Sequence, residues 1–83
     1  MGDVFTFDTV YLGLLQQKKV LESIAVFKVN VEFYPKSSNV YDSLGEAYMA
    51  NGDKALAIAN YKKSLELDPA ISNAREVLKK LEQ

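Results

Sequence analysis

An internal repeat with a period of 34 residues is the feature that most constrains the fold of this chain. A shift of 34 positions pairs six identical residues: Asp8 with Asp42, Ile24 with Ile58, Ala25 with Ala59, Lys28 with Lys62, Glu32 with Glu66 and Pro35 with Pro69. Apolar character is kept where Phe7 pairs with Tyr41, Val10 with Leu44, Leu14 with Tyr48, Phe27 with Tyr61 and Val31 with Leu65. A second shift matches Ser38-Asn39 to Ser72-Asn73 and Leu44 to Leu78. Self-similarity at such a period is typical of stacked structural repeats.

Turn signals divide residues 38–71 into two predicted helices. In Asn51-Gly52-Asp53, Gly52 suits the left-handed conformation that ends a helix, and Asp53 suits the N-cap of the next one. Pro69 ends the second helix because proline cannot continue it. The short turn predicts that the two helices are antiparallel.

The seam between these helices carries the signature of a known family. Gly45 and Ala57 are small residues that would let two helices approach closely. Larger apolar side chains would fill the rest of the seam, namely Tyr41, Leu44, Tyr48, Ile58, Tyr61 and Leu65. With Pro69, these positions resemble the aromatic-x2-Leu-Gly-x2-Tyr…Ala-x3-aromatic…Pro pattern of the tetratricopeptide repeat. The resemblance implies an all-α fold, a right-handed α-solenoid of antiparallel helix pairs with five helices.

The flanking segments complete a single domain over residues 1–83. Residues 4–37 are predicted to form a degenerate repeat, in which Tyr11 stands at the position of the small glycine and Lys18 at that of the turn glycine. Residues 72–83 are predicted to form a capping helix. Its apolar stripe consists of Ile71, Ala74, Val77, Leu78 and Leu81.

Residues 27–33 alternate apolar and polar side chains, a pattern that by itself favours a β-strand. Their counterparts at residues 61–67 have an ordinary helical composition. Because the two segments share one repeat register, we predict a helix for both.

Composition excludes several classes of function. The chain of 83 residues has a net charge of −1, so it offers no basic field for nucleic acid. It has no Cys and no His, and no spacing typical of a catalytic or metal site, so we expect no catalytic residues, no metal, no cofactor and no enzyme activity. Polar residues interrupt every apolar stretch before the roughly 20 residues of a membrane span. We expect a soluble chain without a signal peptide, and the sequence leaves its compartment open.

The family resemblance implies that a protein or peptide segment binds to the concave side of the stack, which the first helix of each pair lines. The residues expected there are Asp8, Leu12, Leu15, Asn39, Asp42, Glu46 and Met49. Asp42 and Glu46 have a second interpretation as an ordinary solvated helix face.

A second candidate surface lies on the second helix of the degenerate repeat. Val26 and Val29 stand where the next repeat has Asn60 and Lys63, and Phe33 adds to the same apolar surface. An exposed apolar surface on a small domain usually marks an interface. Another copy of the chain, an upstream catalytic domain or an exchanged N-terminal helix would cover it; the alternative is an excess of valine without a function.

The chain also resembles repeat tails found at the C-terminal end of some bacterial hydrolases. This resemblance is carried by residues 22–28 and 41–48. It implies that the chain is a fragment of a larger protein.

Overall fold

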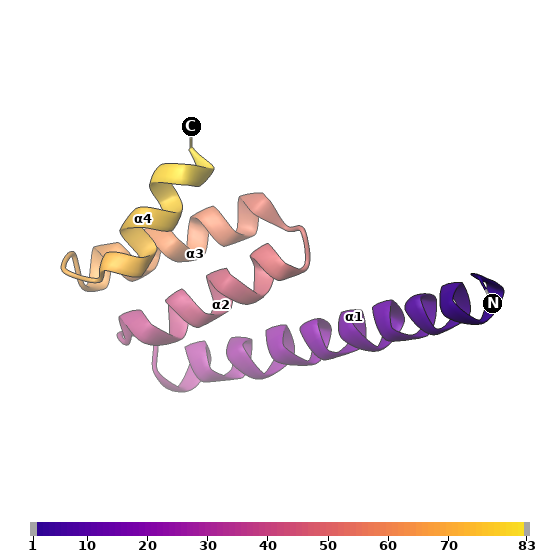
Figure 1. Cartoon of the computed structure of the whole chain (residues 1–83). Coiled ribbons are helices and arrows are strands. Elements are labelled where there is room, and N and C mark those ends of the chain that lie inside the picture. The colour runs from indigo at the N-terminus through magenta and orange to yellow at the C-terminus, as the bar shows by residue number, and fades with distance from the viewer. Residues whose placement is uncertain (1, 83) are drawn as a thin grey trace.

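The fold is all-helical, as a computed structural model of the chain shows (Figure 1). The structure describes the backbone of residues 2–82 and the side chains of residues 15–82, apart from Ser72. Over these residues it contains four helices and no strand: α1 (Gly2–Phe33), α2 (Ser38–Ala50), α3 (Lys54–Leu67) and α4 (Ser72–Leu81). Each helix packs against the next one along the chain. Within the described part, no helix has the length and apolarity that crossing a membrane requires.

The turn between α2 and α3 confirms most of its predicted chemistry. Gly52 adopts a positive φ of 84°, which residues with a side chain rarely adopt. Asp53 occupies the N-cap position of α3, but its side chain makes no capping hydrogen bond. Its carboxylate instead accepts a hydrogen bond of 2.8 Å from the side-chain amide of Asn51. At the other end of α3, Asp68 is the C-cap residue and Pro69 follows it.

The core lies where α2, α3 and α4 meet and where the second half of α1 covers α2. Its most buried apolar residues are Ile24, Leu44, Ala47, Tyr48, Ala57, Tyr61, Ala74 and Leu78. Ser64, which is fully buried, donates a hydrogen bond of 2.8 Å from its Oγ to the backbone carbonyl of Ser38. This bond joins the second half of α3 to the start of α2.

Residues 4–37 do not form the expected helix pair. The structure corrects the prediction of five helices to four, because α1 is one continuous helix of 32 residues. Its N-terminal half runs past the α2–α3 turn and away from the other helices (Figure 1). The helical conformation of residues 27–33 is confirmed.

Two sequence differences explain why the chain does not reverse near residue 18. Lys18 stands where Gly52 adopts its positive φ in the next repeat, and the neighbouring Gln and Lys residues are good helix formers. In that repeat, a Cβ built on Gly45 would lie only 3.1 Å from the ring of Tyr61. Tyr11 has the position of Gly45, so residues 4–17 cannot approach their own second helix in that way.

Candidate protein-binding surfaces

The polar stripe predicted along α2 contacts the start of α4 at Asp42. The side-chain amide of Asn73 donates hydrogen bonds of 3.0 and 3.2 Å to the two carboxylate oxygens of Asp42. Asp42 is half-buried, whereas Asn39, Glu46 and Met49 are exposed. We call Asn39, Asp42, Glu46 and Met49, with Asn73 of α4, the acidic face. This contact links the acidic face of α2 to the start of α4 at Asp42.

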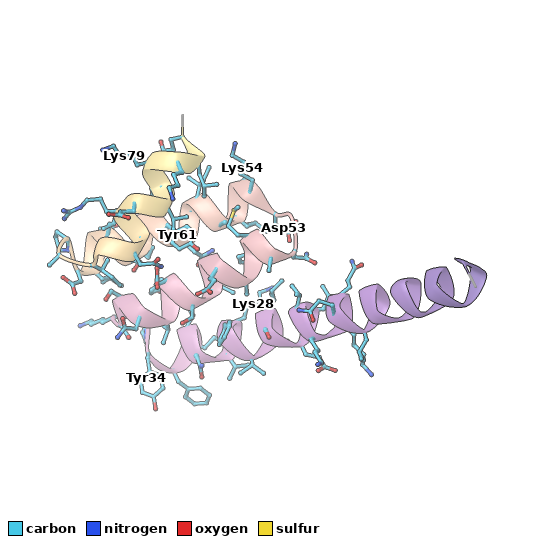
Figure 2. The ribbon with its side chains drawn as sticks, in the orientation of Figure 1. Lys28, Tyr34, Asp53, Lys54, Tyr61 and Lys79 are labelled. Atoms are coloured by element: carbon cyan, nitrogen blue, oxygen red, sulfur yellow. The ribbon has the colours of Figure 1, made fainter. Side chains whose placement is uncertain are left out.

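Tyr61 forms the floor beneath the acidic face. Its side chain extends from α3 toward α2 and is only 2% exposed (Figure 2). Burial raises the pKa of its hydroxyl, and the negative charges of Asp42 and Glu46 raise it further. Gly45 leaves the space that the ring needs. The buried ring thus sets the spacing between α2 and α3.

The first-repeat part of the predicted concave surface does not lie beside α2. The backbone of residues 4–17 belongs to the projecting half of α1, and the side chains of Asp8 and Leu12 lie outside those that the structure describes. Leu15 is 39% exposed. It comes before the part of α1 that packs against the core, which begins at Val20 among the described side chains. The prediction assumed a helix pair in residues 4–37, which the continuous α1 does not provide.

A groove that sequence reasoning missed runs between α1 and α2. It has a volume of about 280 Å³. Its walls are Gln16, Lys19, Val20, Ser23 and Phe27 of α1 and Ser43, Glu46, Ala47 and Ala50 of α2. Glu46 belongs to both the groove and the acidic face. The groove is open because residues 4–17 continue along α1, and the replacements at Tyr11 and Lys18 were its only sequence signal.

The apolar side chains predicted as an oligomer face are exposed on α1. Val26 is 58% exposed, Val29 47% and Phe33 72%. Leu21 and Tyr34 are exposed as well. We call Val26, Val29 and Phe33 the apolar face. Its role as an interface stays a prediction.

The acidic face is suited to holding a ligand by charge and by contact. Among the described residues, no group of three His, Cys, Asp or Glu side chains is placed to hold a metal ion. The carboxylate of Asp42 is hydrogen-bonded to Asn73, and Glu46 projects into solvent. A segment that carries a basic and an apolar side chain would complement the exposed carboxylate of Glu46, the half-buried carboxylate of Asp42 and the apolar Met49.

Comparison with known proteins gives a family match for the middle of the chain. Residues 38–71 match the model of the tetratricopeptide repeat family. Over 39 residues, 47% of this chain, the sequence is 51% identical to cellulose synthase operon protein C of Escherichia coli K12, and equally to the putative protein of that name from strain O157:H7. The match spans only 3% of the length of these relatives. It therefore covers little more than the length of one 34-residue repeat, and the resemblance to hydrolase tails stays a prediction.

Proposed function

We propose that this chain, whose residues 38–71 form a tetratricopeptide repeat, is a non-catalytic module that binds a peptide or protein segment on its acidic face. Repeats of this family generally mediate contacts between proteins. The observation that carries the proposal is the hydrogen-bonded Asp42–Asn73 contact, with Glu46 and Met49 exposed on the following turns of α2. A side chain that already has a hydrogen-bond partner, as Asp42 has, loses less conformational entropy when a ligand binds.

The chemistry of this face favours one class of ligand. Asp42 and Glu46 supply two negative charges on adjacent turns of α2, and Met49 supplies an adaptable apolar contact one turn further on. A segment that pairs Lys or Arg with an apolar residue complements this arrangement. Tight binding by a segment without a basic residue would argue against it.

A random peptide library displayed on phage tests the proposal without a known partner. Peptides selected on the intact chain should be enriched in Lys or Arg, and Glu46→Lys should weaken their binding by tenfold or more. Glu66→Lys is the matched control, because it makes the same charge change on an exposed position of α3. Both variants should keep the thermal midpoint of the parent chain. Equal binding by all three proteins would exclude the acidic face.

A second candidate function is self-association, or docking onto the catalytic domain of a larger parent protein. It is favoured by the apolar face, whose three side chains are each close to half exposed or more. Scattered apolar residues are normal on protein surfaces, but these lie within eight residues of one helix. A chain that stays monomeric at millimolar concentration would exclude the self-association form of this candidate.

The similar Escherichia coli proteins suggest a context for the repeat. In a longer protein, we propose that this unit stacks with further repeats into a right-handed solenoid. The names of those proteins refer to a cellulose synthase operon. Because the match covers one short stretch of them, it supports the repeat architecture and carries no substrate over to this chain.

A further inference from the structure

A comparison of burial between the two repeats shows which surface of α1 lacks a partner. Residues 20–33 of α1 correspond to α3 residues 54–67 through the 34-residue period. At six positions the α1 residue is more exposed than its α3 counterpart: Ser23 against Ala57, Val26 against Asn60, Phe27 against Tyr61, Val29 against Lys63, Asn30 against Ser64 and Phe33 against Leu67. Five of them, at 23, 26, 27, 30 and 33, fall at the spacing of a single helix face.

These α1 positions are more exposed because α1 lacks a neighbouring helix that α3 has. α3 is covered by α2 on one side and by α4 on the other. Among the residues that the structure describes, the equivalent part of α1 packs mainly against α2, and α2 bears the same relation to it that α4 bears to α3. What α1 lacks is the equivalent of α2 on α3. The groove between α1 and α2 lies on the same side, because Ser23 and Phe27 line it.

The sequence of the chain contains the helix that fits this place. By the 34-residue period, the counterpart of α2 is residues 4–16, which keep apolar residues at the positions of Tyr41, Leu44 and Tyr48. The hydrogen bond between Asp42 and Asn73 has an identical counterpart pair, Asp8 and Asn39. A helix of residues 4–17 in the groove would therefore bring Asp8 to Asn39.

The continuous α1 carries the chain's own residues 4–15 away from the groove, whose wall on α1 begins at Gln16 (Figure 1). A tight hairpin would need a turn at Lys18 and a close approach at Tyr11, where the next repeat has Gly52 and Gly45. A helix supplied by another molecule needs no turn and can sit at the wider spacing that Tyr11 demands. Lys18 and Tyr11 thus disfavour a hairpin within one chain more than they disfavour binding of this segment to another molecule.

We propose that two copies of the chain exchange their N-terminal segments, so that residues 4–17 of each copy fill the groove between α1 and α2 of the other. This inference rests on the self-association candidate above and specifies its contact. The exchange covers the stripe from Ser23 to Phe33, and each α1 passes uninterrupted from one copy into the other. It also restores Asp8 and Leu12 to the concave side beside α2, where the repeat pattern predicts them.

Cysteine cross-linking tests the exchange, because the chain has no cysteine of its own. The variant Asp8→Cys with Asn39→Cys should form a disulfide between two chains, seen as a dimer on a non-reducing gel. The variant Asp42→Cys with Asn73→Cys is the matched control: its pair lies within one chain and shows whether this side-chain separation permits a disulfide. Light scattering of the unmodified chain should give twice the monomer mass of 9.3 kDa.

Restoring the turn supplies a second variant. Tyr11→Gly with Lys18→Gly should allow the hairpin to close, which would convert the dimer to a monomer and move the 8–39 disulfide within one chain.

A disulfide within one chain in the parent background would overturn the exchange, as would no disulfide at 8–39 while the control pair forms one. A dimer without the 8–39 disulfide would overturn the exchange but keep self-association. A monomeric mass would overturn both.

Discussion

Gly45 is the position where the spacing of α2 and α3 can be tested most directly. A Cβ at this position would meet three ring atoms of Tyr61 at 3.1, 3.1 and 3.2 Å, which is closer than an ordinary van der Waals contact. Tyr61 is only 2% exposed, so its ring has little room to move. Gly45→Ala therefore sets a packing cost against a gain in helix propensity.

The two effects have opposite signs and comparable sizes. Replacing Gly by Ala in a helix interior contributes about 1 kcal/mol of stability. Extra atoms in a well-packed core cost about 1–3 kcal/mol. Because the added methyl would press on the rigid face of an aromatic ring, we expect the packing cost to win, with a net loss of about 1 kcal/mol. For a domain of this size, that loss lowers the thermal midpoint by about 4–8 °C.

Urea unfolding followed by far-ultraviolet circular dichroism gives the free energy of unfolding for each variant. Ala59→Gly is the control for helix propensity, because Ala59 is exposed on α3 and its loss should cost about 1 kcal/mol without a packing change. The reasoning is refuted if Gly45→Ala raises the stability by as much as Ala59→Gly lowers it. That result would mean that the two helices are not held at their close spacing by Gly45.

Two further predictions concern the same repeat. Gly52→Ala should destabilise the chain by about 1–2 kcal/mol, because Gly52 has a φ of 84° that alanine adopts only with backbone strain. A Cβ there would meet nothing within 4 Å, so only this strain contributes. An unchanged midpoint in a thermal melt would contradict this prediction. Tyr61 has a pKa raised above its usual 10.0, chiefly by burial and then by Asp42 and Glu46, so its folded form holds the proton more tightly than the unfolded form does. The resulting stability is fully present below pH 10 and is lost as the pH rises through the folded pKa. Urea unfolding should show this loss in the parent chain relative to Tyr61→Phe. If the free energy of unfolding had the same slope against pH above pH 10 in both proteins, the prediction would be contradicted.

The acidic face was partly predictable from the sequence. The helical spacing of Asn39, Asp42, Glu46 and Met49 placed them on one side of α2, because that spacing is a local property of a helix. The contact of Asp42 with Asn73 depends on the distance between two separate helices. The repeat register pairs Asp42 with Asp8 and Asn73 with Asn39, but only the structure shows that Asp42 and Asn73 meet.

Local signals determined the repeat at residues 38–71, whose turn glycine, small seam residues and terminal proline each act within a few residues. They also placed helices in both halves of residues 4–33. Whether those halves form one helix or two depends on two competing effects. At Lys18, a turn competes with a continued helix. At Tyr11, the bulky side chain hinders the packing of residues 4–17 against their own second helix, and a continuous helix gives up that packing. Only the tertiary structure decided it, in favour of one continuous helix, because the outcome depends on the spacing between helices rather than on any single residue.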